Sequence, residues 1–166
     1  AEGIVKRDHR DMLSIEELAE IGQAAVRCGV KKIRLTGGEP LVRRGLLELC
    51  RLLRAIPELK ELCLTTNGAL LSQLAQPLQE AGVDRLNISL DTLRPDRFAA
   101  MTRLGRLEDV KAGIAAAEAA GFSHLKLDTV LIGGFNDDEI GDFLELTREH
   151  PWEVRFIELM PMGPCA

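Results

Sequence analysis

The chain alternates short runs of strand-like pattern with longer segments of helical periodicity. Within each short run apolar and polar residues alternate, and in the intervening segments apolar residues recur every three or four positions. The predicted strands are residues 31–36, 61–66, 84–90, 124–131 and 153–159. Repeated strand–helix units predict a parallel sheet in an α/β fold, either open or closing toward a barrel.

The alternation within the strands predicts a sheet with one polar face. Strands of a parallel sheet covered on both faces usually form continuous apolar runs, which these do not. The apolar set, which must pack under helices, is Ile33, Leu35, Leu62, Leu64, Leu86, Ile88, Leu90, Leu125 and Leu127. The opposite set is Arg34, Thr36, Cys63, Thr65, Arg85, Asn87, Ser89, Asp91, Lys126 and Asp128. Inward polar groups need partners. The pattern favours a shared ligand cavity, with a self-satisfied polar network and a wet open sheet as the alternatives.

Two helices have recognisable start signals. Ser14 and Glu17 have the spacing of a capping box, and Gly29 predicts the end of that first helix. The last helix is predicted to begin at Asn136, with the acidic residues 137–139 in its first turn, where negative charge suits the helix dipole. The same acidic residues lack the spacing of a calcium loop.

Composition limits the classes of function. The 166 residues predict a single domain spanning 1–166, and 46% hydrophobic content excludes a disordered chain. No apolar stretch is long enough for a membrane span, and the polar start does not resemble a signal peptide. A net charge of −5 argues against a nucleic-acid partner, so an anionic ligand would need a few local Lys and Arg side chains. The first residue is not Met and the last segment reads as a strand exit, which favours an incomplete molecule.

The cysteines and histidines do not predict a metal site in this chain. Cys28 and Cys50 fall on apolar helix stripes and are expected to be core thiols, and Cys63 is expected to be buried in a strand. Cys165, in a Gly/Pro-rich tail, is the one cysteine open to a functional interpretation. No two cysteines have CxxC-type spacing and no histidines have HxxxH spacing. This usage fits a reducing cytosol, so we expect a cytoplasmic protein.

Turn-forming and polar residues gather where the predicted strands end. The segments 37–40, 66–68, 89–92 and 158–160 all follow strands, and ligands bind at this edge of β/α barrels and open α/β sheets. Gly37 and Gly38 would let a ligand approach the backbone, although a tight turn explains them equally well. No phosphate-binding loop, nucleophile elbow or acid–base pair is present, so no catalytic residue is assigned.

Five motifs occur in order: RLTGGEPL at 34–41, TTNG at 65–68, NISLDT at 87–92, NDDE at 136–139 and RFIELMP at 155–161. This set resembles the GTP 3′,8-cyclases, the molybdenum cofactor biosynthesis protein A family of radical S-adenosylmethionine enzymes. The resemblance runs from about residue 11 to about residue 163. It implies a partial β/α (TIM-like) barrel whose first strand is missing.

The resemblance also implies site residues. The positions that match the S-adenosylmethionine site of the family are Gly38, Ser89 and Met160. The positions that match its GTP site are Arg34, Thr65 and Lys126. Arg34 can offer a two-pronged donor to an anion and Lys126 a point charge. Each of these cations could instead be an interior partner for Asp91, Asp128 or Glu158.

The chemistry implied is radical. In the family, a reduced [4Fe-4S] cluster splits S-adenosylmethionine to a 5′-deoxyadenosyl radical. That radical removes a ribose hydrogen from GTP, and the sugar then bonds to guanine C8, giving (8S)-3′,8-cyclo-7,8-dihydroguanosine 5′-triphosphate. The family's CxxxCxxC loop and its C-terminal cluster cysteines are absent, so we expect this chain alone to be inactive. Asp128 stands where the family more often has Asn, and Gly133 where a basic residue is common.

Three other functions remain open at this stage. They are a radical S-adenosylmethionine enzyme with another substrate, a nucleotide-binding remnant without a cluster, and a conventional phosphate-binding β/α enzyme. The paired presence of Arg34 and Lys126 favours a nucleotide substrate, with GTP as the expected ligand. A homodimer is compatible with the resemblance, and an unpaired parallel edge would favour association.

Overall fold

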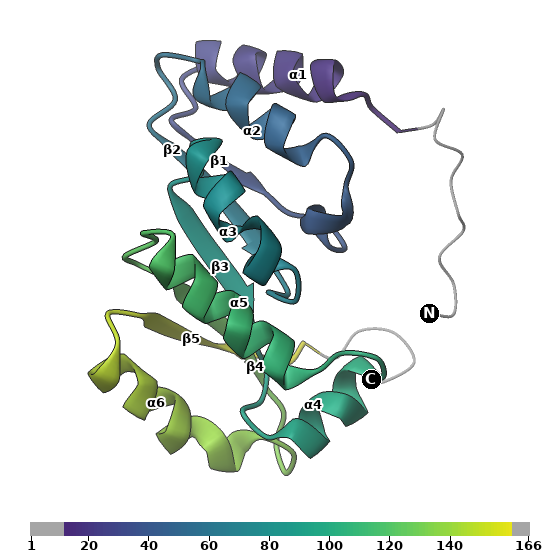
Figure 1. The fold of residues 1–166 in the computed structure, drawn as a ribbon, viewed down its shortest axis with the longest axis vertical. Helices are drawn as coiled ribbons and strands as arrows, with labels where there is room; N and C mark the ends of the chain where they lie inside the picture. The colour runs from purple at the N-terminus through teal and green to yellow at the C-terminus, as the bar shows by residue number, and fades with distance from the viewer. Residues whose placement is uncertain (1–11, 161–166) are drawn as a thin grey trace.

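The computed structural model describes residues 12–160, which form a five-stranded sheet with helices on one side (Figure 1). The strands are β1 (Lys32–Leu35), β2 (Glu61–Thr66), β3 (Arg85–Ser89), β4 (Lys126–Leu131) and β5 (Glu153–Glu158). They lie in the order β1-β2-β3-β4-β5, and every neighbouring pair is parallel. The predicted strands and their parallel arrangement are therefore confirmed, with ends that agree to within two residues.

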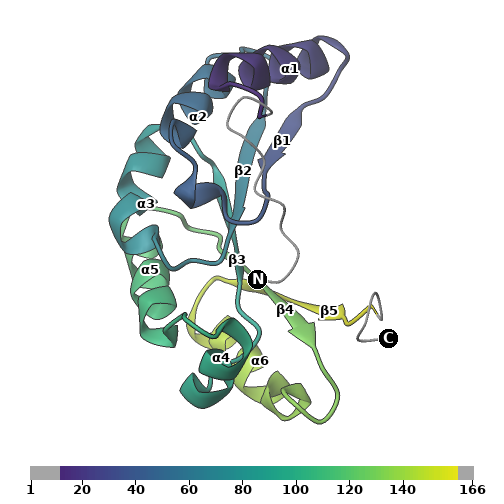
Figure 2. The same ribbon diagram turned by 90° about the vertical axis from the view of Figure 1, so that its right-hand side faces the viewer.

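The connections between strands are helical. The α-helices are α1 (Ile15–Arg27), α2 (Leu46–Arg54), α3 (Leu71–Glu80), α4 (Pro95–Thr102), α5 (Leu107–Ala119) and α6 (Ile140–Glu149). Two short 3-10 turns, η2 (Pro40–Val42) and η3 (Asp137–Glu139), follow β1 and β4. Figure 2 shows the helices along the outer side of a curved sheet. Among residues 12–160, no helix has the length and apolar character needed to span a membrane.

The core lies between the sheet and this helical layer. Leu62, Leu64, Leu86, Ile88 and Leu127 point toward the helices and are fully buried. These five residues belong to the apolar set of the strand alternation, so the predicted packing of that set under the helices is confirmed for them.

Helices α3 and α5 pack against each other more closely than side chains would normally permit. A Cβ atom on Gly113 of α5 would lie 2.3 Å from the carbonyl oxygen of Gly68 and 3.0 Å from the Cβ of Leu71. Glycine at position 113 therefore allows α5 to rest on the start of α3, above the strand ends.

Helix α1 has the predicted start but buries a different face. The Ser14 hydroxyl accepts from the Glu17 amide at 3.2 Å, and the Glu17 carboxylate accepts from the Ser14 amide at 2.7 Å. The expectation that Cys28 is a core thiol is wrong, because Cys28 is exposed and Ile21 on the same stripe is 54% exposed. Instead Gly22 is buried, since a Cβ there would lie 2.3 Å from a methyl group of Leu53 on α2.

The other cysteine predictions hold where the structure describes the residue. Cys50 and Cys63 are buried, and burial raises the pKa of the Cys50 thiol to about 11. Cys165 lies outside the described residues.

The helical segment begins after Asn136 as predicted, but its first turn, which contains the acidic residues 137–139, is a 3-10 turn and not α-helical. The 3-10 turn η3 comes first and α6 begins at Ile140. The Asn136 side chain makes no capping bond, because it is engaged with the backbone of the preceding strands and loop.

Candidate site on the inner face of the sheet

The sheet face opposite the helices, here called the inner face, carries rows of polar side chains. In the strand register Thr65, Asn87, Lys126 and Glu153 face one another across β2 to β5. Ser89, Asp128 and Arg155 form the next row toward the carboxyl edge. Because residues opposite each other in register share a face, these four strands direct the groups to the same side.

Five cationic side chains stand on this face, and most have a carboxylate partner. The five are Lys32, Arg34, Arg85, Lys126 and Arg155. Glu61 lies 2.9 Å from Lys32 and 3.5 Å from Arg85. The hydrogen bond from Lys32 holds the pKa of the Glu61 carboxyl below its usual range. The five cations outnumber their three carboxylate partners, Glu61, Asp128 and Glu153. The inner face is therefore locally positive, although the whole chain is acidic.

Arg34 is the exception to this pairing. Its guanidinium donates to the Thr65 hydroxyl at 3.2 Å, and no carboxylate among residues 12–160 pairs with it. The side chain is exposed on the inner face. Among the described residues, Arg34 therefore has no ion pair to give up before it takes an anionic ligand.

Lys126 lies two strands from Thr65 in the same row, about 10 Å away at the usual strand spacing. It pairs with Glu153 on β5, and its side chain is only 17% exposed, whereas that of Glu153 is 49% exposed. The hydrogen bond from Lys126 lowers the pKa of Glu153. An anion that binds Lys126 must compete with this carboxylate.

Asn87 occupies the centre of the row, between Thr65 and Lys126. Its Nδ2 donates to Asp128 at 2.8 Å, and Asp128 in turn accepts from Arg155 Nε at 2.7 Å. The Asn87 side chain is 1% exposed, yet its Oδ1 has no hydrogen-bond partner among the described residues. A buried acceptor without a donor is costly, so this atom marks a place where a ligand donor would be stabilising.

The GGEP segment places Gly38 at the carboxyl edge. A Cβ on Gly37 or Gly38 would meet nothing within 4 Å, so the backbone is accessible there. The next residue, Glu39, accepts from the Leu41 amide at 2.9 Å and from the Thr66 hydroxyl and the Asn67 amide at 2.7 Å each. This carboxylate ties the loop after β1 to the loop after β2.

The structure brings some of the predicted site residues together and leaves others apart. Arg34 and Thr65 are in contact, Lys126 shares their face, and Ser89 is exposed at the end of β3. Gly38 and Met160 follow β1 and β5, the two outermost strands of the described sheet, and both are exposed.

Sequence reasoning missed four groups of this face as site residues: Lys32, Asn87, Glu153 and Arg155. Their strand parity was visible in the sequence. The parallel register that aligns them with Thr65, Lys126 and Asp128 was not.

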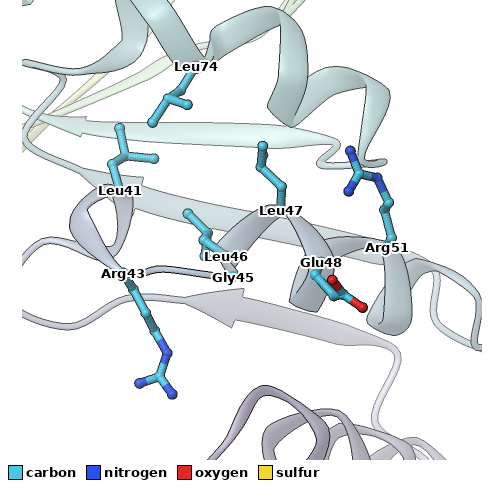
Figure 3. A pocket seen from close by; sticks show the side chains of 8 residues that line it. All are labelled: Leu41, Arg43, Gly45, Leu46, Leu47, Glu48, Arg51 and Leu74. Carbon is cyan, nitrogen blue, oxygen red and sulfur yellow. The ribbon is translucent and has the colours of Figure 1, made fainter. Parts of the chain in front are cut away.

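Two pockets open among the helices rather than on the inner face. One, of about 350 Å³, lies between η2, α2 and α3, where Leu41, Leu47 and Leu74 point toward a common space and Arg43 points away from it (Figure 3). The other, of about 260 Å³, is apolar and is lined in part by Ile114, Leu146 and Trp152. Neither pocket contains a predicted site residue.

Within residues 12–160, no three His, Cys, Asp or Glu side chains gather where they could hold a metal ion. The described residues therefore do not fit an iron–sulfur cluster. They do fit organic ligands that carry phosphate, hydroxyl or amino groups, as the cations, the open glycine backbone and the orphaned Asn87 oxygen indicate.

The fold is found in solved structures. The crystal structure of HydG, a maturase of the [FeFe]-hydrogenase, matches 96% of this chain and 40% of its own length, with a TM-score of 0.68 at 12% identity. Methylornithine synthase (PylB) matches 90% of this chain and 45% of its own, with a TM-score of 0.64 at 18% identity. These neighbours support the α/β fold of partial-barrel type.

A sequence model of the radical SAM superfamily matches residues 3–147, so the chain belongs to that superfamily. The curated relatives are more specific. The GTP 3′,8-cyclase of Peptoclostridium acidaminophilum is 56% identical over 96% of this chain, and that of Moorella thermoacetica is 52% identical over 100%. These matches cover 49% and 51% of the two relatives, so the chain spans about half their length.

Proposed function

We propose that this chain forms the ligand-holding part of a GTP 3′,8-cyclase that acts in molybdenum cofactor biosynthesis. The names of its curated relatives support this function, and one structural observation carries it. Arg34, Thr65 and Lys126, which the family resemblance matches to the GTP site, share the inner face with further cations. A nucleoside triphosphate requires such a group of cations.

GTP would bind across the rows of the inner face. Arg34 lacks a carboxylate partner among the described residues and offers its guanidinium to a phosphate or to the guanine oxygen. The Thr65 hydroxyl accepts from Arg34 and keeps its own proton for the ligand. Lys126 exchanges Glu153 for a phosphate oxygen.

S-adenosylmethionine would lie nearer the carboxyl edge. The backbone at Gly38 is open to a ligand amino group, the Ser89 hydroxyl is exposed at the end of β3, and Met160 is exposed just beyond β5. When bound beside a reduced cluster, S-adenosylmethionine supplies the radical. This chain's own residues hold the two ligands in fixed relation, which is the protein's main contribution to cofactor chemistry.

The proposal includes a cytoplasmic setting and GTP as the partner. It also includes the inactivity of this chain by itself, since the described residues contain no cluster ligands. Full activity therefore needs the cysteines that the family carries elsewhere in its sequence.

The test uses a chimaera in which this chain replaces the matching half of the P. acidaminophilum cyclase. Arg34→Ala should weaken GTP binding at least tenfold, because a charge-assisted bidentate contact is lost, and leave S-adenosylmethionine binding within twofold. Arg51→Ala, on the outer side at α2, is the matched control and should change neither affinity.

Two results would contradict the proposal. Equal weakening of both ligands by Arg34→Ala would make the arginine a structural residue. Binding of ATP as tight as that of GTP, with no cyclised product, would favour a different radical enzyme.

A further inference from the structure

The acidic residues 137–139 do more than begin a helix. Glu139 is fully buried, and its carboxylate accepts from the Thr92 hydroxyl at 2.7 and 2.9 Å, the Leu93 amide at 2.7 Å and Arg97 at 2.7 Å. A helix-start acid could interact with the dipole from an exposed position. Burial of this carboxylate is tolerated only because these donors surround it.

Asn136, at the other end of the segment, reaches the same loop. Its Nδ2 donates to the carbonyl of Asp91 at 2.6 Å and to that of Val130 at 2.9 Å. Its Oδ1 accepts from the Ile132 amide at 2.7 Å. Asn136 is also buried, so the segment Asn136–Glu139 contacts the β3–α4 loop through two buried polar side chains.

The loop is also tied to β4. The Leu90 amide donates to the Asp128 carbonyl at 3.0 Å, and Thr129 donates to the Leu90 carbonyl at 2.8 Å. Asp91 accepts from the Val130 amide at 2.8 Å. Every residue from 90 to 93 is therefore held by β4 or by the segment Asn136–Glu139.

Ser89 comes directly before these residues, and its hydroxyl makes no hydrogen bond within the described part of the chain. We propose that Asn136–Glu139 is a positioning device that holds the β3–α4 loop, and with it Ser89, in place for S-adenosylmethionine. This inference rests on the proposed function. Glu139 acts through Thr92 and Leu93 and touches no ligand.

The positions of the residues proposed for GTP and of Ser89 allow this positioning role to be distinguished from a general effect on stability. Arg34, Thr65 and Lys126 lie within strands, whereas Ser89 stands at a strand end and continues into the held loop. Loosening the β3–α4 loop should therefore affect S-adenosylmethionine and spare GTP.

The experiment compares Glu139→Gln and Thr92→Val with Glu145→Gln in the same chimaera. Gln cannot accept from all of the donors, and Val removes the Thr92 hydroxyl at nearly constant shape. Glu145 is exposed on α6 and pairs with Arg148, outside the segment Asn136–Glu139, so it is the matched control. The readouts are the two ligand affinities by anaerobic equilibrium dialysis and the hydrogen exchange of the Leu93 amide.

Both loop variants should weaken S-adenosylmethionine binding about tenfold, leave GTP binding within twofold and speed exchange of the Leu93 amide. Glu145→Gln should change none of these. Thr92→Val decides the matter if Glu139→Gln does not fold. Faster exchange with unchanged S-adenosylmethionine affinity would overturn the inference alone, as would equal weakening of both ligands. A parent chimaera that binds neither ligand would overturn the proposed function and the inference with it.

Discussion

The ion pair between Lys126 and Glu153 leads to a prediction of tighter binding. If Lys126 must leave Glu153 to bind a phosphate, then removing the carboxylate should help the ligand. Glu153→Gln is therefore expected to lower the dissociation constant for GTP. Most substitutions in a binding site weaken binding, so a gain is a specific outcome.

The magnitude follows from the exposure of the two partners. Exposed ion pairs contribute about 0.2–1 kcal/mol. Lys126 is largely shielded but Glu153 is 49% exposed, so solvent screening limits the pair to about 1 kcal/mol, at the upper end of that range. A gain of about 1 kcal/mol corresponds to a dissociation constant lower by up to about fivefold.

Isothermal titration of GTP into the chimaera at low and at high salt measures this effect. Glu145→Gln is the control, because Glu145 forms an ion pair with Arg148 on α6, away from the inner face. Unchanged or weaker GTP binding by Glu153→Gln would refute the exchange of partners at Lys126. The gain should shrink at high salt, since screening weakens both the old pair and the new one.

Three further predictions concern stability. Gly113→Ala should lower the free energy of unfolding, measured by urea denaturation, by about 2 kcal/mol or more, because its Cβ would meet the Gly68 carbonyl. The control is Gly141→Ala on α6, whose Cβ meets nothing within 4 Å and which should be neutral or stabilising. Equal effects of the two substitutions would contradict the close helix contact. Leu64→Ala, at a fully buried strand position, should cost about 2–5 kcal/mol in the same assay, and a loss under about 1 kcal/mol would argue against the core assignment. The lowered pKa of Glu153 means that its pairing stabilises the fold fully above the ordinary value of 4.5 and is lost as the pH falls through the lower folded value. Unfolding midpoints between about pH 5 and about pH 3 should therefore fall more steeply for the parent than for Glu153→Gln.

Much of the fold could be predicted because strand alternation is a local signal. The apolar set, including Leu62 and Leu86, packs under the helices as the alternation predicts, and all five strands occur in order. The face of α1 that is buried could not be predicted in this way. Its buried face contains Gly22, which has no side chain to contribute to an apolar stripe and is buried because Leu53 approaches it.

Part of the candidate site could also be predicted, because short motifs are local signals in the sequence. Arg34 and Thr65 came from ordered motifs, and the structure places them in contact. Glu153 and Arg155 became visible only through the register of β5 against β4, which depends on backbone pairing between segments more than twenty residues apart. The burial of Glu139 was likewise hidden, because its partners Thr92, Leu93 and Arg97 precede it by 42 residues or more.

The two glutamates at the carboxyl edge divide the rim of the sheet into two halves. Glu39 joins the loops after β1 and β2, and Glu139 joins the loops after β3 and β4. The loops within each pair are thus joined directly, and the two pairs are connected by the β2–β3 ladder and by the packing of α5 on the start of α3. Any opening or closing of this rim would move the two loops of each half together, with Arg34 on one half and the loop that follows Ser89 on the other.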